Sequence, residues 1–205
     1  MTTMTSTHGR ESFQGPRERS LERLRGKWGM WLFIGTEAML FALLFFSYAY
    51  LGASKAEWPP EHDPSLRLPL ILLAILVTSS FVLEWGSKGI EKGSQLRLKL
   101  GLILTLMFSA AFLYVQKLEY VHHLKEVTPG TNAYGSILFT ILSFHLAHLI
   151  LGSAMLLYVL ARSFAGHFSE RKHLAVENVS LYWHFVDVVW LFIVGILYVS
   201  PHLYD

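Results

Sequence analysis

Five long apolar segments constrain the fold of this chain more than any other feature of its 205 residues. Each is close to or longer than the ~20 apolar residues that a helix needs to cross the hydrocarbon core of a bilayer. With 53% hydrophobic and only 16% charged residues, the composition is that of an integral membrane protein. We therefore predict an all-α, polytopic membrane bundle with spans at about 28–51, 68–86, 98–117, 134–161 and 178–200.

A polar, basic segment, 1–27, precedes the first span. The apolar run that follows is longer than the apolar region of a signal peptide, so we expect this N-terminal leader to stay attached. Its Thr- and Ser-rich beginning is expected to be disordered. Residues 28–205 are predicted to form one membrane domain, because five helices and their links leave no room for a separate soluble domain. The chain has no cysteine, which excludes disulfides and thiolate metal ligands.

The seventeen lysine and arginine residues are distributed unevenly between successive links. Thirteen lie in the leader and in the second and fourth links, whereas four lie in the first and third links. Because cytoplasmic loops accumulate Lys and Arg, this asymmetry predicts the N-terminus inside and, with an odd number of spans, the C-terminus outside. The net charge of +2 is then explained by topology, and it gives no indication of a nucleic-acid partner.

Several ionisable side chains fall at membrane depth within or at the ends of the predicted spans. Such groups are costly in hydrocarbon, so each is a candidate for a functional role or a helix contact. The candidates are Glu37, Glu84, Glu119, His145, His148, His184 and Asp187.

Two pairs among these candidates have a spacing found in metal sites of helix bundles. His145 and His148 are three residues apart, as are His184 and Asp187, so each pair shares a helical face. Inward-facing imidazoles and carboxylates of a bundle can hold metals. The other interpretation is that these side chains form hydrogen bonds between helices, where an unpartnered polar group would be expensive. We favour helix contacts and predict no metal, cofactor or catalytic site within this chain.

Glu37 is the only charged side chain in the first apolar run. Since hydrocarbon disfavours the charged form of an acid, we expect Glu37 to be protonated. Two roles remain open for it. One is a structural hydrogen bond to a backbone carbonyl or to a hydroxyl such as Ser47 or Thr78, and the other is proton or lipid handling. Glu84, near the inner end of the second span, can instead reach water or pair with Lys88, four residues on.

The fifth span carries a polar and aromatic stripe. At helical spacing it comprises Ser180, Trp183, His184, Asp187, Trp190 and Val194. A stripe of this composition buries poorly in lipid, so we predict that it faces another helix or another subunit.

Several segments resemble subunit III of haem-copper terminal oxidases. These segments are "WGMWLFIGTEAMLFA", "WPPEHDP…LPL", "LTLMFSAAFLYVQKLEY", "SFHLAHLILG" and "ENVSLYWHFVDVVWLFIVGILYV". Their order and spacing match the family from about Trp28 to Val199, and "YWHFVDVVWLF" is a highly specific motif.

The resemblance implies a protein like the short, five-helix bacterial form of this subunit, which lacks the first two helices of the seven-helix type. Such a subunit carries no haem or copper, which belong to partner subunits. It packs against the catalytic subunit I, in a complex with subunit II and other respiratory subunits, in the bacterial inner membrane. A V-shaped cleft, expected here between helices 1–2 and helices 3–5, holds structural phospholipids. The family also supports proton uptake into subunit I and prolongs the working life of the enzyme.

Three family motifs coincide with candidate residues. Glu37 matches the membrane carboxylate of W-L-F-x-x-S-E, which the family shows to react with carbodiimides, although Thr replaces Ser here. His145 and His148 match the histidines of G-F-H-G-L-H, with Ser and Leu in place of its glycines. Glu119 matches the acid of Q-x-x-E-Y. After the second span, where many members have Trp-Ala-His-His, this chain has Trp-Gly-Ser-Lys, which leaves the polar contacts there unassigned.

The resulting hypothesis is a non-catalytic subunit of a proton-pumping oxygen reductase. One alternative is the related accessory subunit of nitric oxide reductases, which shares this architecture. Another is an independent small transporter that uses Glu37 as a proton site, although the sequence has neither the repeats nor the broken helices typical of transporters.

Overall fold

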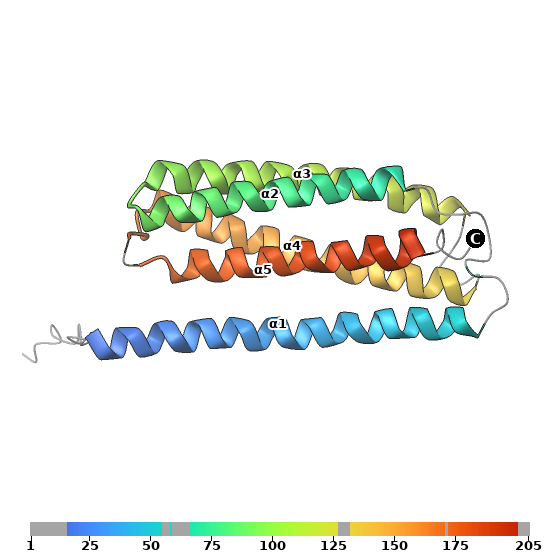
Figure 1. Cartoon of the computed structure of the whole chain (residues 1–205). Helices are drawn as coiled ribbons and strands as arrows, with labels where there is room; N and C mark the ends of the chain where they lie inside the picture. Colours follow the sequence, from blue (N-terminus) through green and yellow to red (C-terminus); the bar gives the residue numbers. More distant parts are fainter. Residues whose placement is uncertain (1–15, 55–57, 59–65, 127–131, 171, 201–205) are drawn as a thin grey trace, which may run out of the picture.

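The chain folds into five long helices that run alongside one another (Figure 1). The structure, a computed structural model, describes residues 16–54, 58, 66–126, 132–170 and 172–200, without the side chains of 16–19, 119 and 122–126. The helices are α1 (Pro16–Ala53), α2 (Arg67–Glu91), α3 (Gln95–Glu126), α4 (Ala133–Phe164) and α5 (Leu174–Ile193). A short π-helical segment, η1 (Val194–Val199), continues α5.

All five helices are long and apolar enough to cross a membrane, and the described residues contain no β-strand. The predicted fold class is therefore confirmed. The first four helices extend beyond their predicted spans at both ends, whereas α5 begins before its predicted span and gives way to η1 at Val194. α1 begins at Pro16 with no break at the boundary predicted for the leader. The segment predicted to be disordered lies outside the described residues.

One end of the bundle gathers most of the described basic side chains. α1, α3 and α5 run in one direction, and α2 and α4 run in the other. The N-terminal ends of α1, α3 and α5 therefore lie beside the C-terminal ends of α2 and α4 (Figure 1). This end, called the basic end below, carries Lys27, Lys88, Lys92, Lys99 and Arg162. The side of the membrane that it faces stays a prediction from the charge distribution.

α2 and α3 form the most extensive helix pair of the bundle. The turn between them uses Gly93 at φ 79°, a left-handed conformation that costs glycine little. Farther along the hairpin, a Cβ on Gly101 would lie 2.8 Å from the Cα of Gly86. The absence of both side chains lets the two backbones approach closely, as is common where helices pack in membranes.

α5 occupies the centre, in contact with α1, α2 and α4. Its Trp183 and Trp190 are fully buried. The indole N–H of Trp183 donates to the hydroxyl of Ser79 at 2.9 Å, and that of Trp190 donates to the carbonyl of Pro69 at 3.4 Å. The prediction that the stripe of the fifth span faces protein is confirmed for these two residues, because both fasten α5 to α2.

The predicted grouping of helices 1–2 against helices 3–5 is wrong. α2 packs on α3 and α5, whereas α1 contacts α4 and α5 and has no extensive contact with α2. The tight α2–α3 hairpin is the reason, because it places α2 beside α3 and leaves α1 at the opposite edge of the bundle (Figure 1). The expected cleft between the first two helices and the other three is therefore absent from the described part of the chain.

Candidate functional site

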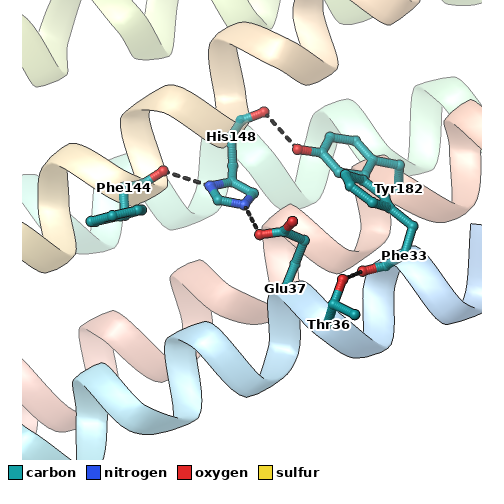
Figure 2. Close-up of polar contacts among 6 residues, drawn as sticks. All are labelled: Phe33, Thr36, Glu37, Phe144, His148 and Tyr182. Carbon is teal, nitrogen blue, oxygen red and sulfur yellow. Dashed lines mark hydrogen bonds and ion pairs between the residues drawn. The ribbon is translucent and has the colours of Figure 1, made fainter.

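Glu37 and His148 form a polar pair between α1 and α4 (Figure 2). Oε2 of Glu37 lies 2.9 Å from Nε2 of His148. The two side chains are 22% and 11% exposed, so the pair is largely shielded. Glu37 lies ten residues beyond Lys27, about 15 Å deeper at 1.5 Å per residue. That depth is near the middle of a hydrocarbon core ~30 Å thick.

Neighbouring groups fix the orientation of the imidazole (Figure 2). Nδ1 of His148 lies 2.7 Å from the carbonyl oxygen of Phe144, one turn earlier on α4. The hydroxyl of Tyr182 on α5 donates to the backbone carbonyl of His148 at 3.3 Å, and the Tyr182 ring stacks on Phe33 of α1 with centroids 6.0 Å apart. The ring of Phe41 meets the imidazole edge-on at 5.0 Å. Three helices thus hold the pair in place.

This geometry gives the pair one shared proton. A backbone carbonyl can only accept, so Nδ1 of His148 carries a hydrogen. The contact between Nε2 and Oε2 then requires one further proton, which resides either on Glu37 as a carboxylic acid or on His148 as part of an imidazolium. Both forms are neutral overall and both keep the hydrogen bond. The pair can therefore hold a single proton in either of two positions.

The predicted hydroxyl partners of Glu37 are wrong. Ser47 and Thr78 donate to backbone carbonyls of their own helices at 2.8 and 2.7 Å. The hydrogen of each hydroxyl is therefore already used within its own helix and is not donated to Glu37. The partner is the imidazole of His148, which reaches Glu37 from α4.

His145 has different surroundings from His148, although the two are three residues apart. Three helical steps of about 100° each leave their side chains about 60° apart around α4. His145 is 1% exposed, and its ring packs 4.9 Å from Trp190 and 6.0 Å from Phe112. Neither ring nitrogen has a hydrogen-bond partner among the described residues. His145 therefore contributes a helix contact through its ring, and not through the hydrogen bonds that we predicted.

Asp187 and His184 also point to different partners, both on α2. The hydroxyl of Ser80 donates to Oδ2 of Asp187, whose Oδ1 is buried without a partner in the described part of the chain. Nε2 of His184 lies 3.7 Å from Glu84. Glu84 also lies 3.1 Å from Nζ of Lys88, which is one of the two alternatives that the sequence leaves open for it.

The remaining candidate, Glu119, lies on α3 toward the end opposite the basic end, and its side chain is outside the description. The expectation for Glu119 stays a prediction. Where side chains are described, no group of three His, Asp or Glu residues is placed to hold a metal ion.

Glu177, near the start of α5, is an additional ionic contact that the sequence pattern does not indicate. This carboxylate lies 2.6 Å from Nζ of Lys27, 3.7 Å from the guanidinium of Arg23 and 2.9 Å from Nε2 of His173. An acid in the first turn of a helix is an ordinary feature of a sequence. Its role in fastening α1 to α5 depends on the register between two helices, for which the sequence carries no signal.

Comparison with known proteins identifies the family of this chain. The model of the family described as "Cytochrome c oxidase subunit III" matches residues 8–201. The cytochrome c oxidase subunit 3 of Drosophila melanogaster is 33% identical over 180 residues, which cover 84% of this chain and 68% of that protein. The corresponding proteins of Synechocystis sp. and Thermostichus vulcanus are 36% and 33% identical over 173 and 177 residues. These alignments cover 83% of this chain in both cases, and 73% and 85% of the two relatives. The chain, a multi-pass membrane protein, therefore belongs to the cytochrome c oxidase subunit III family.

Proposed function

We propose that this chain is the non-catalytic subunit III of a proton-pumping haem-copper oxygen reductase and that it packs directly on the catalytic subunit I. The observation that carries the proposal is the family match over residues 8–201, which contains all five helices of the described chain. Haem and copper then belong to partner subunits, and oxygen is reduced there. The location that follows is the bacterial inner membrane.

Affinity purification of the tagged chain in mild detergent tests this assignment. We expect a complex that contains a haem-copper catalytic subunit and subunit II and that consumes oxygen. A partner that reduces nitric oxide would contradict the proposal in favour of the accessory subunit of that enzyme. Proton transport by the chain reconstituted alone would contradict it in favour of an independent transporter.

The Glu37–His148 pair supports a part in proton uptake for this subunit. It holds one proton in two neutral forms that share the same hydrogen bond. A complex that carries Glu37→Gln is expected to assemble normally, because the amide can still donate to Nε2 of His148. It should lose activity after fewer turnovers than the wild type, because the exchangeable proton is gone. An unchanged number of turnovers before inactivation would leave the pair a purely structural role.

The outer face of α1 supports the binding of structural phospholipids. Large apolar side chains are exposed along it, including Leu32, Met39, Leu43 and Phe46. At the basic end the same helix exposes Arg25, which suits a phosphate headgroup. We expect native mass spectrometry of the complex to find bound anionic phospholipid that is reduced by Arg25→Ala and unchanged by Lys92→Ala. Equal lipid content in both variants would contradict this assignment.

A further inference from the structure

A series of polar side chains follows the contact between α2 and α5, from the basic end toward the middle of the bundle. This α2–α5 seam consists of Ser80, Glu84 and Lys88 on α2 and of His184 and Asp187 on α5. Spacings of four on α2 and three on α5 keep each set on one face of its helix. Ser80 donates to Asp187, and Glu84 lies 3.7 Å from His184, so the two helices are linked twice along the seam.

The two links differ in how far they are buried. Ser80 is 7% exposed, and Oδ1 of Asp187 is buried without a partner among the described residues. The side chains of Glu84 and His184 are each 42% exposed. The Glu84–His184 link therefore opens to the outside of the bundle, in contrast to the shielded pair between α1 and α4.

His184 lies too deep for its exposure to be explained by water at the membrane surface. Glu177, held by Lys27 and His173, marks the polar level of the basic end. His184 is seven residues farther along α5, about 10 Å deeper at 1.5 Å per residue. Long Lys and Arg side chains can reach back over part of such a distance, but an imidazole on a single methylene cannot.

The exposed faces of α1, α3 and α4 suit contact with lipid, whereas the α2–α5 seam does not. On α1, α3 and α4, large apolar side chains are exposed at membrane depth, among them Met39, Phe46, Met107 and Leu157. Ionisable side chains within spans almost always face protein or a water-filled cavity. Of the described outer faces, the α2–α5 seam is therefore the one that requires a polar cover.

We propose that the α2–α5 seam is the face on which the catalytic subunit docks, through a membrane helix that presents hydrogen-bond donors at the depth of Glu84. This inference rests on the proposed function, because it assumes a complex with that subunit. Donors suit the seam because the exposed Glu84 offers carboxylate oxygens there, beside His184. Phe81 and Val188 are 73% and 50% exposed beside these groups and supply the apolar surface for helix packing.

Photo-crosslinking in the purified complex tests the docking face. A photoreactive residue is placed at Phe81, three residues from Glu84, or at Val188, four residues from His184, so that each shares a face with the seam. Matched controls replace Met39 on α1 and Leu157 on α4, which are 70% and 59% exposed. We expect adducts with the catalytic subunit from the two seam positions and not from the controls.

Two other crosslinking results would overturn the inference while leaving the proposed function intact. One is adducts with the catalytic subunit from the control positions alone, and the other is only lipid adducts from the seam. If no haem-copper catalytic subunit is present in the complex at all, the proposed function fails and the docking face fails with it.

Substitution of Glu84 tests whether docking depends on the polar contact of this side chain or only on the shape of the surface. Glu84→Leu is expected to release this chain from the complex at a lower detergent concentration, whereas Glu84→Gln, which keeps an acceptor, should retain it. Glu91→Leu, at the exposed end of α2, is the matched control and should behave as the wild type. The helical content measured by circular dichroism should be equal in all variants. Full retention of Glu84→Leu at every detergent concentration would overturn the polar part of the docking proposal.

Discussion

His148 determines what Glu37 can do in the membrane. Because Nδ1 of His148 is tied to the carbonyl of Phe144, only Nε2 is free to share a proton with the carboxyl group. A lone acid at this depth could not release its proton without leaving an unpaired carboxylate in hydrocarbon, which is energetically costly. With the imidazole as partner, the proton can move across one hydrogen bond while the pair stays neutral. The expectation that Glu37 is protonated stays a prediction.

Substitutions of Glu37 should therefore differ according to whether they keep the hydrogen bond. We predict that Glu37→Gln leaves the melting temperature of the complex near that of the wild type. Glu37→Leu should destabilise by about 1–3 kcal/mol, because Nε2 of His148 is left buried without a partner. Thermal unfolding of the two variants measures the difference. Equal losses in both would show that the carboxyl group itself is needed for the structure.

At the scale of the helices, the sequence is sufficient to predict their number and type. It is not sufficient to predict which helices pack against each other. The five apolar runs predict five spans because the thickness of the bilayer sets the length of a helix. Which helices pair depends on features such as Gly86 facing Gly101, and two glycines in different spans carry no sign that they will meet. For the same reason the sequence offered Glu37 and His148 as separate candidates, and their contact became visible only with the register of α1 against α4.

The α2–α3 contact should be sensitive to a single methyl group. We predict that Gly101→Ala destabilises the bundle by about 1–3 kcal/mol, because its Cβ would lie 2.8 Å from the backbone of Gly86 and force the helices apart. The matched control is Gly35→Ala in α1, where an added Cβ meets nothing within 4 Å. That control should be neutral or slightly stabilising, because alanine favours a helix. Thermal unfolding followed by circular dichroism compares the two variants, and equal melting temperatures would contradict the prediction.

The attachment of α1 to α5 at the basic end should depend on Glu177. We predict that Glu177→Gln weakens the contacts with Lys27 and Arg23 by about 1 kcal/mol or less, since these cations are about half exposed. Amide hydrogen exchange in the first described turns of α1 should then be up to about fivefold faster, with no change in α3. Glu91→Gln, an exposed acid at the same end, is the control. Unchanged exchange after loss of Glu177 would show that packing alone holds the start of α1.

On the scale of the whole molecule, α1 is held to the other helices at three levels. Glu177 binds its basic side chains at one end, and the Glu37–His148 pair lies near the middle. At the opposite end Trp58 packs against Tyr48 and Tyr134, with ring centroids 5.4 and 5.1 Å away. The remaining helices contact each other more extensively, so α1 is the element most dependent on a few specific contacts. Its apolar outer face and the polar seam between α2 and α5 give the bundle two chemically different sides.

The distribution of charge along the bundle axis predicts how the molecule is inserted. The basic end carries Lys92, and the opposite end carries Ser54 just after α1; both are exposed. Because loops rich in Lys and Arg are retained in the cytoplasm, we expect the basic end inside. Because the chain has no cysteine of its own, a single cysteine introduced at either position is labelled without competition from other thiols of the chain. With a membrane-impermeant maleimide, Ser54→Cys should be labelled in intact cells, and Lys92→Cys only after the membrane is opened. The unsubstituted chain should take up no label, and the reverse pattern of accessibility would show that the bundle is inserted the other way round.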